Sequence, residues 1–153
     1  MYHEIVTGKY DLASQFYFDG IAVCEKNGLP YATSIYHSLG VMFHTSDNYE
    51  KALEYYSIAY ERSKKDEDTV IQKKCLINMG SIYSSLQDFE KAEELMQKSL
   101  TLDVRRELDY STYANLGNLF IRQEKFKEAI PYLEKATEIH PDNSDSEENI
   151  MYL

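Results

Sequence analysis

The sequence predicts an all-α protein built from antiparallel helix–turn–helix repeats. Only 3 prolines and 6 glycines interrupt the 153 residues, which favours regular helices with short connections. Two motifs alternate along the chain, and the spacing inside each pair of motifs is constant. Hydrophobic residues make up 43% of the chain, enough to form a core, so a disordered chain is excluded.

The first motif predicts the first helix of each repeat. It recurs as IYHSLGVMF, CLINMGSIY and TYANLGNLF, where Gly40, Gly80 and Gly117 are each followed three residues later by an aromatic residue. A glycine lets two helices approach closely, and the aromatic residue fills the space beside it.

The second motif predicts a turn and the second helix. It recurs as GKYDLASQFYFDG, DNYEKALEYYSIA, QDFEKAEELMQKS and EKFKEAIPYLEKA, each with two small residues 7 positions apart on one helical face. The distances Gly40–Ala52, Gly80–Ala92 and Gly117–Ala129 are all 12 residues. A generic amphipathic bundle needs only the helical period and would not repeat these offsets. The predicted units are a partial repeat 1–28, repeats 29–68, 69–107 and 108–143, and the start of a further helix at 144–153.

This pattern resembles the tetratricopeptide repeat. The matching residues are Tyr36, Leu39, Gly40, Phe43, Ala52, Tyr56 and Ala59; Leu76, Met79, Gly80, Tyr83, Ala92, Met96 and Ser99; and Tyr113, Leu116, Gly117, Phe120, Ala129, Leu133, Ala136 and Pro141. The resemblance implies a single right-handed α-solenoid domain. The long period of 37–40 residues is similar to arrays of bacterial signalling and regulatory proteins, and to some eukaryotic scaffold arrays.

Both ends of the chain resemble half-repeats. At the start, residues 1–6 are expected to end a first helix, GKYD to form a turn, and a second helix to follow around 11–26. At the other end, Asn149 and Ile150 match the first motif, and Met151 replaces its glycine. Unpaired ends would expose Leu12 and Phe16, or Ile150 and Met151. The chain is therefore either a fragment of a longer array or a possible homo-oligomer that associates through its open ends.

The charge and motif content exclude several classes of function. With 16 Lys+Arg against 26 Asp+Glu, the net charge of −10 disfavours nucleic acids and anionic membranes. No phosphate-binding, nucleophile-elbow or metalloprotease motif is present, so we expect no enzyme, no cofactor and no metal site. The runs SKKDED and VRRELD are expected to be solvated helix ends. No signal-like segment opens the sequence, which favours a cytoplasmic location for this chain, and Cys24 and Cys75 are expected to be reduced thiols.

The resemblance also implies where a partner binds, because the first helices of such arrays line a concave groove. The face of these helices away from the packing stripe carries the candidate groove residues. They are Ser34, His37, Val41, His44, Lys74, Ile77, Ser81, Ser84, Ser111, Ala114, Asn118, Ile121 and Arg122. Only Asn118 fits the clamp with which some relatives hold chaperone tails. The predicted function is a protein-interaction module that binds a peptide or helix of a protein partner as part of a larger scaffold or signalling protein. The alternative is a structural spacer or self-association unit without a groove ligand.

Overall fold

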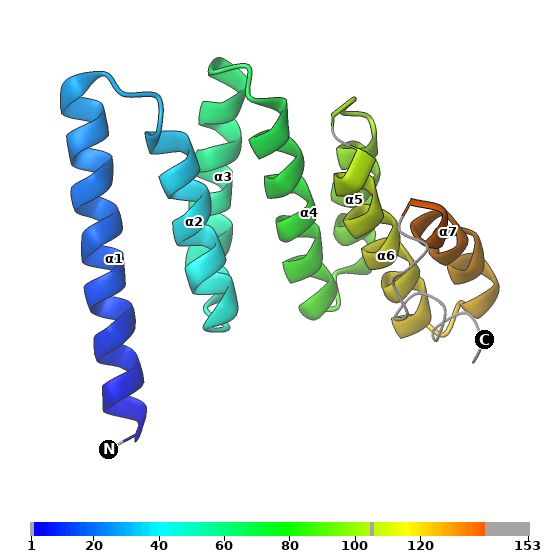
Figure 1. The fold of residues 1–153 in the computed structure, drawn as a ribbon. Coiled ribbons are helices and arrows are strands. Elements are labelled where there is room, and N and C mark those ends of the chain that lie inside the picture. Colours follow the sequence, from blue (N-terminus) through cyan, green and yellow to red (C-terminus); the bar gives the residue numbers. More distant parts are fainter. Residues whose placement is uncertain (1, 105, 140–153) are drawn as a thin grey trace. The chain divides into compact units, whose positions relative to one another are not determined.

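The computed structural model describes the backbone of residues 2–104 and 106–139 and the side chains of residues 12–104 and 107–139. Its regular structure in these ranges consists entirely of α-helices (Figure 1). The helices are α1 (Tyr2–Asn27), α2 (Ala32–Thr45), α3 (Tyr49–Lys65), α4 (Thr69–Ser85), α5 (Phe89–Leu100), α6 (Arg106–Arg122) and α7 (Phe126–Ile139). They fall into two compact units, residues 1–71 and 72–153, which are described separately below.

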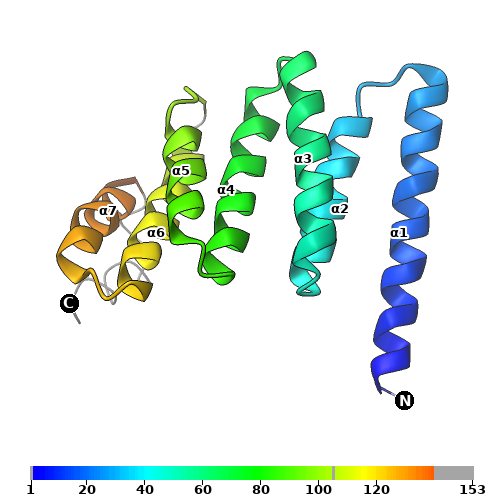
Figure 2. The ribbon, with the colours of Figure 1, turned by 180° about the vertical axis from the view of Figure 1, so that it is seen from behind.

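The first unit is centred on the hairpin of α2 and α3, with α1 packed on α2 (Figure 2). Leu39 of α2 and Tyr56 of α3 are fully buried between the hairpin helices. Ile21 and Cys24 are the buried apolar residues of the described part of α1. Across the outer side of the hairpin, the rings of Phe43 and Tyr55 stack with their centroids 5.4 Å apart.

The second unit contains most of α4 together with α5, α6 and α7. Its core includes Ala92 and Met96 of α5, packed against Leu116 and Leu119 of α6. A second cluster joins Phe120 of α6 to α7 through residues 129 and 133. The all-α class and the helix–turn–helix repeat are therefore confirmed, whereas the limits of the individual repeats stay predictions.

The turns inside the repeats share one backbone geometry. Asp47, Gln87 and Glu124 have φ values of 57°, 64° and 60°, so each occupies the left-handed region at the same position of its repeat. The next residue directly precedes the second helix. In two repeats it is Asn48 or Asp88, whose side chain accepts a hydrogen bond from the backbone N–H three residues on, at 3.3 and 3.2 Å. These caps mark the start of α3 and α5.

The glycines of the first motif allow the paired helices to approach closely. A methyl group added at Gly40 would lie 2.5 Å from the ring of Tyr56, and one added at Gly117 would lie 2.4 Å from Leu133. At Gly80 the nearest atom would be a side-chain carbon of Met96, at 2.9 Å. The predicted close contact between small and large residues is thus present in all three hairpins.

The turn predicted at GKYD is wrong, because α1 continues as one helix from Tyr2 to Asn27. Gly8 would suit the left-handed position of a turn, and Lys9 matches Lys125, which follows Glu124 in a turn that does form. A continuous helix instead satisfies the backbone N–H groups that the turn would have left unpaired.

The expected exposure at the start of the chain is confirmed, since Leu12 and Phe16 are 60% and 67% exposed. The corresponding expectation for Ile150 and Met151, and the further helix at 144–153, lie outside the described residues.

Candidate functional site

The second unit contains a hollow of about 350 Å³ between α4 and α6. Four of the predicted groove residues line it: Lys74, Ile77, Ser111 and Ala114. The other lining residues are Asn78, Leu108, Tyr110 and Asn115. The structure therefore brings together two predicted residues from each of two neighbouring first helices.

The helical period explains which side chains meet at the hollow. On α4 the lining positions are 74, 77 and 78, at i, i+3 and i+4, and on α6 positions 111, 114 and 115 repeat this spacing, with 108 and 110 before them. Asn78 and Asn115 were missed as site residues, although both stand two positions before the glycine of the first motif. This shared position was the sequence signal that could have identified them.

The lining combines apolar surface with amides and one charge. Ile77 is only 6% exposed, and with Leu108 and Ala114 it supplies apolar surface to the hollow. Lys74 is the one charged residue among the described lining residues. The hollow is therefore locally cationic on a chain whose net charge is −10.

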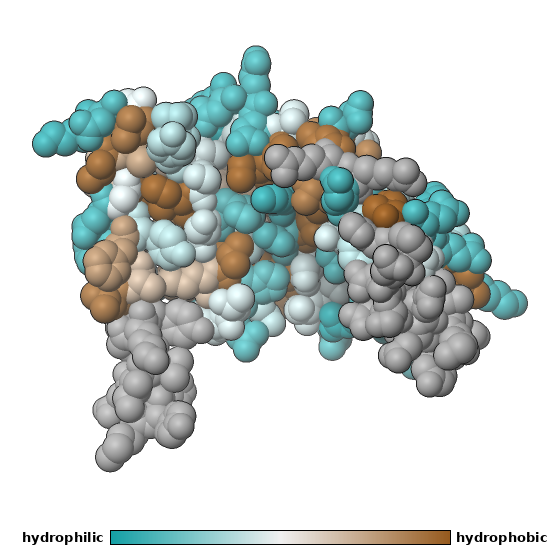
Figure 3. Space-filling model, in the orientation of Figure 1, coloured by the Kyte–Doolittle hydropathy of each residue, from teal (hydrophilic) through white to brown (hydrophobic). Residues whose placement is uncertain are grey.

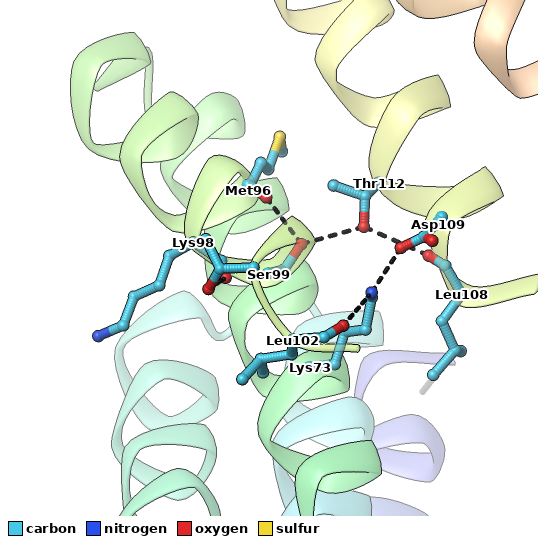
Figure 4. A network of polar contacts seen from close by, with 9 residues as sticks. Lys73, Met96, Lys98, Ser99, Leu102, Leu108, Asp109 and Thr112 are labelled. Atoms are coloured by element: carbon cyan, nitrogen blue, oxygen red, sulfur yellow. Dashed lines mark hydrogen bonds and ion pairs between the residues drawn. The ribbon is translucent and has the colours of Figure 1, made fainter. Parts of the chain in front are cut away.

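An ion pair between a buried lysine and a half-buried aspartate joins the two helices that form the hollow (Figure 4). Lys73 is fully buried, and its Nζ donates to Asp109 Oδ1 at 2.5 Å and to the backbone oxygen of Leu102 at 3.0 Å. Beside it, the hydroxyls of Ser99 and Thr112 are hydrogen-bonded at 3.0 Å. Since consecutive helical residues are about 100° apart, Lys73 points into this network while the next residue, Lys74, lines the hollow.

The expectation that the charge runs at the corners are solvated is confirmed for residues 64–68, which are exposed, and is wrong for Asp109, which is half-buried. In VRRELD, Asp109 pairs with the buried Lys73. In SKKDED, Asp66 accepts a hydrogen bond from the Thr33 hydroxyl at 2.6 Å, and Asp68 caps α4 through the backbone N–H of Ile71 at 3.0 Å. Asp66 and Asp109 thereby give the buried Thr33 and Lys73 side chains hydrogen-bond partners.

The other predicted residues of the second unit lie outside the hollow. Arg122 of α6 donates a hydrogen bond from Nη1 to Ser84 Oγ of α4 at 3.2 Å. Both belong to the predicted set, and Ser84 is buried whereas Arg122 is exposed. Ile121 is half-buried against the cluster that joins α6 to α7. Ser81 is half-buried and Asn118 is exposed.

The four predicted residues of the first unit do not line the hollow. Ser34 and Val41 are exposed, and the Ser34 hydroxyl donates to the Tyr31 backbone oxygen at 2.8 Å. The His37 ring lies 5.5 Å from that of Tyr56, and His44 lies 6.3 Å from the same ring. Burial lowers the pKa of His44 below its ordinary value of 6.5, outweighing the opposing effect of Asp47. Burial therefore favours the uncharged form of the His44 ring, which lies against Tyr56.

None of the helices in the described ranges is long and apolar enough to cross a membrane. Over the same part of the chain, no three His, Cys, Asp or Glu side chains gather where they could hold a metal ion.

Comparison with known proteins identifies the repeats directly. Two family models, both described as tetratricopeptide repeat, match residues 31–103 and residues 110–143. Among solved structures, BtubC (BKLC) from P. vanneervenii superimposes with a TM-score of 0.74 at 22% identity, covering 88% of this chain. The chain spans 57% of the length of that protein. The Arabidopsis OM64 TPR domain gives a TM-score of 0.66 at 17% identity, covering 79% of this chain and 93% of the domain. At these identities the likeness concerns the fold alone.

Proposed function

The chain belongs to the tetratricopeptide repeat family, and we propose that its hollow between α4 and α6 binds a short segment of a partner protein. Tetratricopeptide repeats are generally protein–protein interaction modules rather than enzymes. The proposal therefore goes beyond the general role of the family by naming the binding site on this chain and the kind of ligand. The long repeat period supports a place within a larger scaffold or signalling protein, and we expect that protein to act in the cytoplasm.

The observation that carries the proposal is the composition of the hollow. Ile77 and Ala114 offer apolar surface, Asn78 and Asn115 offer amides, and Lys74 offers a cation. An extended segment suits this lining, because its backbone needs donors and acceptors while one side chain is buried. Lys74 favours a peptide that carries an acidic residue next to the buried side chain. At about 350 Å³ the hollow is at the small end for ligand sites, which favours a few side chains over a whole domain.

The test is a selection of random phage-displayed peptides on the 153-residue chain. We expect the enriched peptides to combine an apolar residue with a neighbouring acidic one. Their affinity, measured by fluorescence anisotropy, is expected to fall at least about tenfold with Lys74→Glu and with Ala114→Arg, which corresponds to about 1.4 kcal/mol. The matched control is Lys127→Glu, which reverses the charge of an exposed lysine on α7. Ile77 is not substituted, because a lysine there would be buried and would destabilise the fold.

Two results would reject this assignment. One is the absence of any enriched peptide. The other is an equal loss of affinity in the variants of the hollow and in the Lys127→Glu control, once circular dichroism has shown that all of them fold. An equal loss of affinity would mean that the peptide binds elsewhere, or that affinity depends only on the net charge of the chain.

The second candidate function is a structural spacer or self-association unit without a groove ligand. The observation that favours it is the exposure of Leu12 and Phe16 on α1, since soluble chains rarely leave neighbouring large apolar side chains uncovered.

A further inference from the structure

The helices α4 and α6 are joined well beyond the hollow. Near their starts, Lys73 of α4 pairs with Asp109 of α6. Near their ends, Ser84 of α4 accepts the hydrogen bond from Arg122 of α6. The two contacts are 11 residues apart on α4 and 13 on α6, which is about 16–20 Å of helix. The hollow occupies only the first part of this length.

The predicted groove residues continue from the hollow along one face of each helix. They stand three or four residues apart, at 74, 77, 81 and 84 on α4 and at 111, 114, 118 and 121 on α6. That spacing keeps side chains on the same side of a helix. Beyond the hollow, Ser81 is half-buried and Asn118 is exposed, so polar side chains that solvent can reach extend the surface toward Arg122.

No charged residue of either helix stands between Lys74 and Arg122 along this length. Residues 75–85 of α4 and 110–121 of α6 contain no Asp, Glu, Lys or Arg, although these types make up 27% of the chain. A cation stands at each end instead, because Lys74 lines the hollow and Arg122 is the last residue of α6. On a chain with a net charge of −10, an uncharged strip between two cations favours an acidic ligand.

The guanidinium of Arg122 is oriented by two neighbours. Its Nη1 atom donates to Ser84 Oγ at 3.2 Å, and its Cζ atom lies 5.9 Å from the centre of the Phe89 ring. Ser84 is only 7% exposed, whereas Arg122 is exposed. A guanidinium has five N–H donors, so the bond to the serine leaves donors for a carboxylate. A side chain that is already oriented loses little conformational entropy when it binds.

We propose that Arg122 is a second anchor for the partner segment whose first acidic residue binds Lys74, so that this segment carries two acidic residues. The inference rests on the proposed function, because it extends the same bound segment along α4 and α6. Ser84, which holds Arg122, lies ten residues after Lys74, or about 15 Å along α4. An extended chain advances about 3.3 Å per residue, so the second acidic residue is expected about five positions from the first.

The experiment measures whether Arg122 and the second acidic residue act on each other. The probe is the most enriched phage-displayed peptide with two acidic residues at this spacing, together with two versions in which one or the other is replaced by glutamine. By fluorescence anisotropy, Arg122→Gln is expected to lower the affinity for the parent peptide about threefold to fivefold. The same variant is expected to bind the version without the second acidic residue as the wild type does. Lys74→Gln is expected to respond only to the first acidic residue.

Two further variants test how Arg122 is held. Ser84→Ala removes the hydrogen bond that orients the guanidinium and is expected to weaken binding of the parent peptide about twofold. The same substitution is expected to have no effect in a chain that already carries Arg122→Gln, because Ser84 acts through the arginine. Arg122→Lys keeps the charge but loses the planar set of donors, so its affinity is expected to lie between those of the wild type and Arg122→Gln.

Two control variants change other exposed surfaces. Lys127→Gln removes a positive charge from an exposed residue of α7. Phe16→Glu alters α1, where hydrophobic side chains gather on the α1 side of Figure 3 and Phe16 is 67% exposed. Neither is expected to change the affinity. Added salt is expected to weaken binding of the parent peptide more than binding of the single-acid versions, because salt screens local ion pairs.

Three results would overturn the proposal. If no enriched peptide carries a second acidic residue at this spacing, while affinity still depends on Lys74, the hollow binds the segment without a second anchor. If Arg122→Gln weakens all three peptides equally, with an unchanged free energy of unfolding in urea, Arg122 does not contact the second acidic residue. If neither Lys74→Gln nor Arg122→Gln changes any affinity, the hollow itself is not the binding site and the proposed function fails as well.

Discussion

Replacing glycine by alanine at two helical positions of the first unit is expected to change stability in opposite directions. Gly20 lies within α1 and Gly40 within α2, so both substitutions gain about 1 kcal/mol from the higher helix propensity of alanine. What differs is the space around the new methyl group. At Gly20 it would lie 3.4 Å from Ile35 Cδ1, an ordinary contact, whereas at Gly40 it would lie 2.5 Å from the ring of Tyr56.

The ring of Tyr56 has no room to move aside. It is fully buried, and the rings of His37 and His44 lie 5.5 and 6.3 Å from it. Reaching a normal carbon–carbon separation requires a shift of about 1 Å. Overpacking costs about 1–3 kcal/mol, and the fully buried ring of Tyr56 places this case in the upper part of that range, at about 2–3 kcal/mol. After the propensity gain, Gly40→Ala is expected to lose about 1–2 kcal/mol, while Gly20→Ala gains up to about 1 kcal/mol.

The assay is urea unfolding followed by circular dichroism, with thermal melts as a second measurement. For a chain of this size, 1 kcal/mol corresponds to about 2–4 °C in Tm. Gly80→Ala provides an intermediate case, because the nearest atom is a carbon of the flexible Met96 side chain at 2.9 Å. Its free energy of unfolding is expected to stay close to that of the wild type.

Two outcomes would refute this reasoning. If Gly40→Ala were as stable as the wild type, Tyr56 would not be fixed against α2 in the way the hairpin requires. If Gly20→Ala lost as much stability as Gly40→Ala, the difference in space would not be what decides the effect.

Three further predictions concern buried groups. Asp109→Ala leaves the ammonium of Lys73 buried without its charge partner and is expected to lower the free energy of unfolding in urea by about 3 kcal/mol. The double variant with Lys73→Met is expected to recover most of that loss. If Asp109→Ala were as stable as the wild type, the ion pair would not contribute to stability. Ala92→Leu, at a fully buried position in the core of the second unit, is expected to cost about 1–3 kcal/mol by overpacking, and an unchanged melt would refute the helix register. Because burial lowers the pKa of His44, the unfolded chain binds a proton at a higher pH than the folded chain does. The neutral, buried His44 therefore stabilises the fold fully above pH 6.5, and this stabilisation is lost as the pH falls through the lower pKa of the folded state. His44→Gln is expected to flatten this pH dependence, and an unchanged slope would rule out His44 as its source.

The hairpins were predictable because the residues that pack together in them are separated by the same number of positions in each repeat. Gly40 and Tyr56 are 16 residues apart, as are Gly80 and Met96, so the same alignment recurs whatever the length of the connection between repeats. A constant separation between a small and a large residue predicts which residues of two helices pack against each other. Helical periodicity alone predicts only which face of each helix is buried.

The polar interior was not predictable in the same way. Lys73 and Asp109 are 36 residues apart and their contact depends on the exact rotation of α4, so Lys73 and Lys74 look alike in the sequence although one is buried and the other lines the hollow. The turn expected at GKYD failed for a related reason. Its residues match the motif, but a turn forms only where packing on both sides outweighs continuing the helix.

The hollow and the exposed side chains of Leu12 and Phe16 on α1 can be tested separately. The hollow is lined by side chains of α4 and α6, whereas Leu12 and Phe16 belong to α1 in the other unit. Lys74→Glu alters the first and Phe16→Glu the second, and neither substitution removes a buried apolar group. Peptide affinity and self-association are therefore expected to respond independently, because separated sites contribute additively unless they share a partner. If Phe16→Glu also weakened peptide binding, assembly of copies would be a condition for binding, and the two candidate functions would be one.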